Sequence, residues 1–475
     1  MCAAGCVVAL APGYQIAKET RAIRFIPGEN PALAIHVDFT VRNSGTSELN
    51  FIDVRLPSGQ STGRTDLRVE VDGAETVPSA LPRDESPSPP GLLRIALAKP
   101  WMRKQRLELR FDYTLRSPAY SAAYVTIDSN SFHLGVRGWA PQLQPPEHLL
   151  AAYPSRPSRM TYAIRVPANF AVLAGGLAKG QKRLGAEIEY RYELNSAALG
   201  AFAAAGRYAS WPANTSRKAV TFWTTEPLRE NPAESAEQVA LIWSALTKNF
   251  GVFDPSIAAP HLVESASVQD PFGRRSDPAA VGFPGGALLN PPAFDLRIGS
   301  TRFFEIVGAA LARNWFDIEV LPSAEAEVGM GDGLPEYASV VADEARNGAS
   351  ARRQRIRRYL QLYDAAAKNA DETPIAATTA SSPAAQLRIA MAKAPLFYIA
   401  LEDACGEAQV RAGLAHMLVS LRGQEVDYHV LRSALEESTG RDLGRTFRQW
   451  LDQKGVPGDF RARYSLPADV QGVRD

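Results

Sequence analysis

The spacing of apolar residues changes halfway along the chain, and this change constrains the fold more than any other feature. Five segments of the first half are apolar at every second position: 33–43, 93–100, 106–116, 160–167 and 186–194. This alternation is typical of half-buried antiparallel strands. After an N-terminal tail at 1–25, we therefore expect a β-rich domain over 26–215, built as a saddle or a sandwich.

In the second half, apolar residues recur at helical spacing. Segment 231–250 opens with Asn231, which suits an N-cap, and Pro232, which suits the first helical position. Further helical patterns cover 301–316, 333–347, 351–370, 384–404, 406–421, 428–438 and 442–453. The sequence thus predicts a mainly helical domain over 216–475, a domain border within about 210–230, and an α+β fold class.

Size and charge exclude several classes of protein. The 475 residues leave room for two or three domains, and the net charge of +1 gives no argument for a nucleic-acid partner. No apolar run reaches the roughly 18 residues that a membrane-spanning helix needs. The three cysteines, Cys2, Cys6 and Cys405, form neither a disulfide framework nor a zinc-ribbon spacing.

The N-terminus allows two interpretations. In "MCAAGC", small residues precede Cys6 as they do at the end of a bacterial lipoprotein signal, but no basic segment or apolar core lies upstream. An acylated Cys6, or Cys2, would make the protein extracytoplasmic, either periplasmic or membrane-anchored. If Met1 is the true, unmodified start, the protein would stay in the cytoplasm.

The segment "FFEIVGAALARNWFDIEV" at 303–320 is the most informative local pattern. It predicts a helix that ends in Asn-Trp-Phe-Asp, as helices of the His-Glu-x-x-His type do in many zinc peptidases. In those helices, two histidines at i and i+4 bind one metal ion and the glutamate polarises a bound water. Here the three places hold Ala309, Ala310 and Arg313. Nineteen positions after Arg313 comes Asp332, within "GDGLPEYAS".

This frame resembles the gluzincin aminopeptidases, the family of alanyl aminopeptidase and leukotriene A4 hydrolase. The family's Asn-Glu-Gly-Phe-Ala-Glu-Tyr segment is similar to "GDGLPEYAS" and ends on Glu336 and Tyr337. Five other segments resemble the family: 162–176, 199–208, 284–290, 391–418 and 431–457. The resemblance covers roughly residues 30–460 and implies a saddle domain followed by a thermolysin-like domain. From the resemblance, we expect no counterpart of the family's C-terminal helical-repeat domain.

The resemblance also implies chemical roles that the residues at these positions cannot fill. Leu289 stands where the family's glutamate grips the substrate amine, and Met391 where its tyrosine stabilises the oxyanion. Asp332 stands where the third zinc ligand is a glutamate. An alanine cannot bind zinc, and an arginine stays protonated. We therefore expect no catalytic residue, no metal and no cofactor.

Arg313 is expected to form an ion pair with Asp332 or Glu336 in place of a metal ion. Asp332 and Glu336 lie at i and i+4, which would also suit an acid–base dyad. A nearby Arg313 is expected to hold the pKa of both carboxyls low.

Other chemistries find little support. Gly-Gln-Ser-Thr-Gly at 59–63 matches Gly-x-Ser-x-Gly, but it lies among the strand patterns of the first half and not between a strand and a helix, so we expect no nucleophile elbow there. The chain has no phosphate-binding Gly-x-x-x-x-Gly-Lys loop. His261 and His416 are expected to be structural residues, and Cys405 a structural thiol. The basic run "ARRQRIRRYLQLY" at 351–363 is expected to be a solvated helix face or a set of salt-bridge partners, with a patch for an anionic partner as the alternative.

Three hypotheses about function follow. The first is a non-catalytic, aminopeptidase-like scaffold or binding protein whose partner is an unknown protein or peptide. The second is an active metallo-aminopeptidase, or another hydrolase with relocated catalytic residues. The third is a structural subunit of a larger membrane-associated assembly, anchored through an acylated Cys6. We favour the first, combined with the third.

Overall fold

The computed structural model describes residues 13–56, 64–80, 92–116, 125–135, 139–144, 160–194, 202–225, 232–253, 260–265, 268, 277–294, 296, 300–323, 325–379 and 382–465. Cys2 and Cys6, on which the lipidation hypothesis rests, lie outside these residues. The chain divides into two compact units, with the division between Arg207 and Tyr208.

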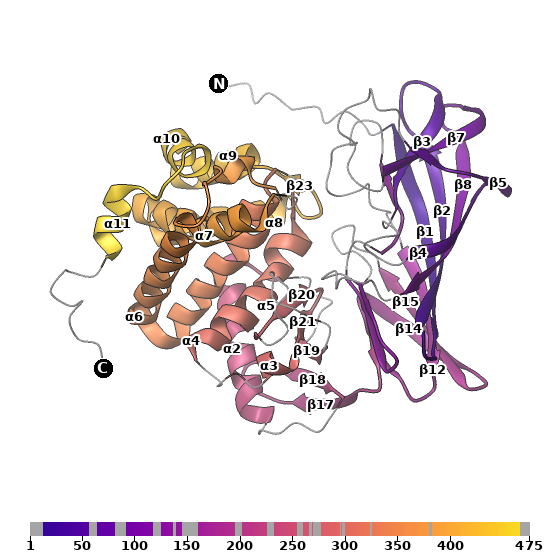
Figure 1. The fold of residues 1–475 in the computed structure, drawn as a ribbon, viewed down its shortest axis with the longest axis horizontal. Helices are drawn as coiled ribbons and strands as arrows, with labels where there is room; N and C mark the ends of the chain where they lie inside the picture. Colours follow the sequence, from indigo (N-terminus) through magenta and orange to yellow (C-terminus); the bar gives the residue numbers. More distant parts are fainter. Residues whose placement is uncertain are drawn as a thin grey trace. The chain divides into compact units, whose positions relative to one another are not determined.

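An eight-stranded sheet dominates the described part of the first unit (Figure 1, indigo to magenta). Its strands, in sheet order, are β14 (Leu177–Leu184), β15 (Glu187–Leu194), β12 (Met160–Pro167), β1 (Tyr14–Ile26), β2 (Ala32–Asn43), β8 (Arg106–Arg116), β4 (Arg64–Val71) and β5 (Ala74–Thr76). One four-stranded sheet holds β13 (Ala171–Ala174), β16 (Ala203–Gly206), β10 (Ser131–Leu134) and β9 (Val125–Ile127). Another holds β11 (Gln142–Gln144), β3 (Leu49–Arg55), β7 (Leu92–Trp101) and β6 (Ser79–Ala80).

The five alternating segments of the first half form β2, β7, β8, β12 and β15, which confirms the prediction of strands there. Two expectations were wrong. The predicted tail at 1–25 contains most of β1, which pairs with both β2 and β12 inside the sheet. The pairing of β1 with β12 is parallel, so the sheet is mixed and not purely antiparallel.

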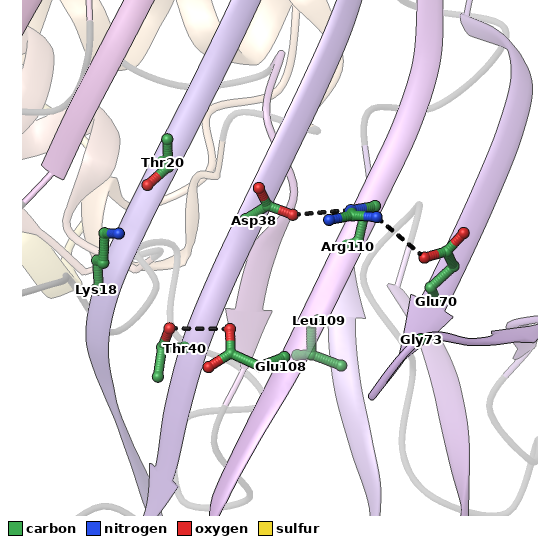
Figure 2. Close-up of a pocket in the computed structure, with 9 residues that line it drawn as sticks. All are labelled: Lys18, Thr20, Asp38, Thr40, Glu70, Gly73, Glu108, Leu109 and Arg110. Atoms are coloured by element: carbon green, nitrogen blue, oxygen red, sulfur yellow. Dashed lines mark hydrogen bonds and ion pairs between the residues drawn. The ribbon is translucent and has the colours of Figure 1, made fainter.

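Alternation buries one face of the large sheet and leaves the other polar. On β2, Val37, Phe39 and Val41 are buried, and Phe39 packs edge-on against Phe111 of β8. On the opposite face, Arg110 donates to Asp38 (Nε–Oδ1 3.0 Å) and to Glu70 (Nη1–Oε2 3.4 Å), so charges of opposite sign lie side by side on neighbouring strands (Figure 2).

His36 extends this row of charges. Its two ring nitrogens lie 2.7 Å from Asp112 and 2.9 Å from Asp38. Burial disfavours the charged imidazole, but the hydrogen bonds to the two carboxylates outweigh that effect and raise the pKa of His36.

The second unit begins with a five-stranded sheet of order β17 (Ala209–Ala213), β18 (Val220–Thr224), β19 (His261–Glu264), β21 (Gly286–Leu289) and β20 (Ala280–Phe283). Strands β18, β19 and β21 run parallel, whereas β17 and β20 are antiparallel edges. Because β17 pairs with β18, residues 209–213 join this unit, and the division falls a few residues before the predicted border at 215.

Helices make up most of the rest of this unit (Figure 1, pink to yellow). They are α2 (Pro232–Phe250), α3 (Pro291–Phe294), α4 (Thr301–Phe303), η2 (Phe304–Gly308), α5 (Ala309–Arg313), η3 (Asn314–Glu319), η4 (Glu327–Asp332), α6 (Gly333–Ala367), η5 (Ile375–Ala377), α7 (Ala384–Cys405), α8 (Glu407–Ser420), α9 (Tyr428–Thr439), α10 (Gly444–Phe447), η6 (Arg448–Asp452) and α11 (Gly458–Tyr464). Two short strands, β22 (Leu321–Pro322) and β23 (Glu425–Val426), pair in parallel.

The helical patterns predicted from the sequence are confirmed, with one change. The segments 333–347 and 351–370 belong to one kinked element, α6. The kink is at Gly348, whose φ of 79° lies in the left-handed region that glycine adopts without steric cost. None of the described helices is both long enough and apolar enough to cross a membrane.

Candidate functional site

The helix that carries positions 309–313 is firmly anchored at both ends. It begins at Ser300, whose hydroxyl caps the backbone N–H of Phe303 at 3.1 Å. At the far end, Trp315 is fully buried, meets Trp243 edge-on at 5.0 Å and donates to the carbonyl of Gly251 at 2.9 Å. The aromatic Trp-Phe pair after position 313 therefore fixes this helix against α2.

The edge strand β20 lies directly on the same helix. A β-carbon at Gly282 would lie 2.2 Å from the carbonyl oxygen of Ala310 and 2.8 Å from Cβ of Arg313. Ala309 and Ala310 are both buried, with 8% and 2% of their surface exposed. The backbone of β20 thus lies against Ala310 and Arg313, and only glycine fits at position 282.

Arg313 lies at the centre of a small charge cluster. Its Nη2 is 2.6 Å from Oδ1 of Asp332, and its Nη1 is 3.0 Å from the carbonyl oxygen of Gly331 and 3.3 Å from Oδ2 of Asp317. About a quarter of the Arg313 and Asp332 side chains is exposed, and a tenth of that of Asp317. Sequence reasoning missed Asp317, although its i+4 spacing from Arg313 is the usual signal for a helical ion pair.

Glu336 was the other carboxylate expected to pair with Arg313, but its hydrogen bond and its nearest guanidinium come from other residues. It accepts a hydrogen bond from the hydroxyl of Tyr359 at 2.6 Å and lies 3.7 Å from Nη2 of Arg355. Loss of hydration raises the pKa of Glu336, because it outweighs the opposing effect of the Arg355 charge. The expectation that this pKa is held low was therefore wrong. The expectation treated Arg313 as the dominant neighbour and did not include desolvation.

Two further predicted positions lie on other elements. Leu289 is 1% exposed on β21, an internal strand, opposite Ala280 of β20. The strand that borders Ala310 and Arg313 is the neighbouring β20, through Gly282. Met391 lies on α7 and is half-buried. Its thioether has no proton to donate to an oxyanion.

The remaining candidate groups have ordinary structural surroundings. His261 accepts a hydrogen bond from Trp223 at 3.2 Å, and burial lowers its pKa to about 4. His416 lies on α8. Cys405 is buried at the end of α7, where burial raises the pKa of its thiol and so disfavours the nucleophilic thiolate.

Within the part of the chain that the structure describes, no three or more His, Cys, Asp or Glu side chains lie close enough together to hold a metal ion. At the end of the helix that carries positions 309–313, Arg313 forms ion pairs with Asp317 and Asp332.

Comparison with known proteins identifies the fold. No protein-family model matches the sequence, and no curated protein matches it. Among solved structures, the M1 zinc metallopeptidase from Deinococcus radiodurans is 15% identical with a TM-score of 0.66, and the match covers 94% of this chain and 95% of that one. A mutant of that enzyme with one glutamate replaced by alanine is 16% identical, also at 0.66, over 94% and 96% of the two chains.

A third structure, a two-domain M1 zinc metallopeptidase mutant bound to L-tryptophan, gives a TM-score of 0.65 at 16% identity, over 94% of this chain and 96% of that one. The matches thus span nearly the whole length of both proteins. The architecture described above is the fold of the M1 zinc metallopeptidases, which is the gluzincin fold that the sequence resemblance implies.

Proposed function

We propose that this protein is a non-catalytic, aminopeptidase-like scaffold or binding protein. The observation that carries the proposal is the ion pair between Arg313 and Asp332, at 2.6 Å. It places a permanent positive charge against the carboxylate that stands where the similar enzymes' third zinc ligand is expected. The methyl groups of Ala309 and Ala310 provide neither a ligand nor a base.

Electrostatics supports this proposal. A dication about 4 Å from a guanidinium would be repelled by roughly 8 kcal/mol at an effective dielectric constant of about 20. That repulsion is comparable to the roughly 10–16 kcal/mol that a full set of ligands gives to structural zinc. Asp317 and Asp332 provide only two carboxylates, both already engaged by Arg313. We infer that these residues do not fit a zinc ion.

For the ligand, we infer a peptide or a protein segment. One of the similar metallopeptidase mutants is described as bound to a Tyr-Ser-Ala substrate. A protein that keeps this fold without the chemistry could still hold such a chain. The identity of proteins that co-purify with the native protein would test this part of the proposal, and reproducible absence of any partner or bound peptide would argue against it.

Purified protein is expected to bind less than stoichiometric zinc and to hydrolyse no aminoacyl-coumarin substrate above background. The measurement is elemental analysis after incubation with zinc and dialysis, together with a fluorescence assay. The matched variant is Asp332→Asn, which removes the carboxylate but keeps the size of the side chain. One zinc ion per chain with turnover that this variant abolishes would establish an active metallo-aminopeptidase. Turnover without zinc would establish another hydrolase.

We also propose that the protein is extracytoplasmic and anchored to a membrane-associated assembly through Cys6, on the strength of the "AAGC" pattern. In the native host, the N-terminal peptide is then expected to begin at an acylated cysteine. Mass spectrometry of that peptide decides the matter, because a peptide that begins at an unmodified Met1 would rule the anchor out.

A further inference from the structure

A polar pocket of about 410 Å³ lies in the second unit, between the start of the helix at Thr301 and the second half of α6. Every residue that lines it is polar or charged. Besides a threonine and two glutamines, the lining consists of one carboxylate and four guanidinium groups: Glu305, Arg302, Arg355, Arg357 and Arg358. No apolar residue lines the pocket, so the specific contacts that it offers to a ligand come from charged and polar groups.

The charges of this pocket are unbalanced. Glu305 is held by Nη1 of Arg302 and Nε of Arg358, each at 2.7 Å, and lies 3.8 Å from Nε of Arg355. Arg302 and Arg358 therefore share this carboxylate, whereas Arg355 also lies near Glu336 and Asp343, which are not part of the lining. The fourth, Arg357, donates to the backbone carbonyl of Tyr464 at 3.1 Å, which is a neutral acceptor. The lining thus holds four positive charges and one negative charge.

Arg355 is fully buried, and two of its side-chain nitrogens have no hydrogen-bond acceptor among the described residues. Its side chain is 0% exposed, and its Nη2 donates to Ser339 and to Tyr359, both at 2.8 Å. Its Nε and Nη1 have no hydrogen-bond acceptor among the described residues. The nearest carboxylate oxygens lie 3.8 Å away on Glu305 and 3.6 Å away on Asp343, beyond hydrogen-bond distance. A buried charged donor without an acceptor is unfavourable, and an anion close to it would relieve that cost.

The arginines of the basic run on α6 therefore differ in their surroundings. Arg352 is buried against Glu344 and Glu402, so it belongs to the protein's internal ion pairs and not to a solvated face. Arg357 and Arg358 reach the pocket, and about half of the Arg358 side chain is exposed. If the basic run binds an anionic partner, which was the alternative expectation, this pocket is where Arg357 and Arg358 would bind it.

We propose that this pocket binds a small phosphate-bearing anion, with Arg302, Arg357 and Arg358 as its ligands and Glu305 as the internal anion that it partly replaces. Guanidinium groups that converge from two helices match the tetrahedral set of phosphate oxygens, and paired N–H donors bind such oxygens in a bidentate manner. The phosphate could belong to a soluble ester or to a lipid headgroup. This inference does not depend on the proposed function.

Pyrophosphate is the probe, titrated into the full-length protein by calorimetry at constant ionic strength. Saturable one-to-one binding is expected for the native chain. The double variant Arg302→Gln/Arg358→Gln is expected to bind at least about tenfold more weakly, because two charge-assisted contacts are lost. The matched control is Arg353→Gln, which removes the same charge from an exposed position of the same helix outside the pocket and should change the affinity less than about twofold.

Glu305→Gln provides a test with the opposite sign. Loss of the internal carboxylate frees Arg302 and Arg358, so pyrophosphate should bind about fivefold more tightly or better. A structural role alone would not produce tighter binding. Thermal unfolding of each variant identifies any that do not fold, and the single variant Arg358→Gln, at a half-exposed side chain, then carries the test.

A second arm uses vesicles to distinguish the two sources of phosphate. If the pocket binds a lipid headgroup, the protein should float with phosphatidylglycerol vesicles but not with phosphatidylcholine vesicles. Arg358→Gln should then reduce flotation, and Arg353→Gln should not. Pyrophosphate binding without flotation assigns the pocket to a soluble ester. The proposal is overturned if the native chain shows neither, if Arg353→Gln weakens binding as much as the pocket variants, or if Glu305→Gln weakens it.

Discussion

Replacing Ala309 and Arg313 together with histidine is expected to create a zinc site that holds one ion per chain. The two positions lie at i and i+4 on one helix, the spacing with which paired histidines hold a metal ion. Arg313 already reaches Asp332, so an imidazole from position 313 and one from 309 would have that carboxylate as a third ligand. The substitution also removes the guanidinium that repels a dication.

The gain in zinc affinity over the native chain should be at least about a hundredfold, measured by competition with a chromogenic chelator. Either single histidine variant is the control, because each supplies at most two ligands. No peptide hydrolysis is expected from the double variant, since position 310 still lacks a carboxylate base. If the double variant binds zinc no better than the single variants, the positions inferred for the metal are wrong.

Replacing Glu402 with alanine is expected to lower the free energy of unfolding by about 3–5 kcal/mol. The Glu402 side chain is 0% exposed and lies 2.5 Å from Nη2 of Arg352 and 2.7 Å from Nε of Arg411. It also accepts a hydrogen bond from Tyr337 at 2.6 Å. Without this carboxylate, two largely buried guanidinium groups would lose their shared counter-ion, and the desolvation cost of both would remain.

Urea denaturation at neutral pH measures this loss. Glu407→Ala is the matched control, because Glu407 pairs with the same Arg411 at 3.1 Å but is 51% exposed. An exposed pair of this kind contributes about 0–1 kcal/mol. Equal losses for the two variants would contradict the role assigned to Glu402.

Five of the strands and most of the helices could be predicted, because each follows from the spacing of apolar residues within one segment. The missed strand β1 shows where this method fails. Its register to β2 shifts between Ile16 and Lys18, so the alternation of buried residues breaks within the strand. A bulge of this kind is set by the neighbouring strand, and a single segment does not reveal it.

The candidate site was predictable only where one helix or one fixed spacing determines it. The pairing of Arg313 with Asp332 follows from the nineteen-residue spacing in the family resemblance. The contact of Gly282 with Ala310 depends on which strand forms the sheet edge, and that is a tertiary property. Likewise, the burial of Arg355 among carboxylates from three other turns of helix could not be read from the basic run.

The glycine at position 282 has a mechanical consequence. Because the backbone of Gly282 lies against the carbonyl of Ala310, the strand has no side chain at this point that could change rotamer and absorb a displacement. Any substituent larger than hydrogen would act as a wedge and drive the sheet edge away from Ala310. The distance between this strand and this helix is therefore set by the absence of a β-carbon at position 282.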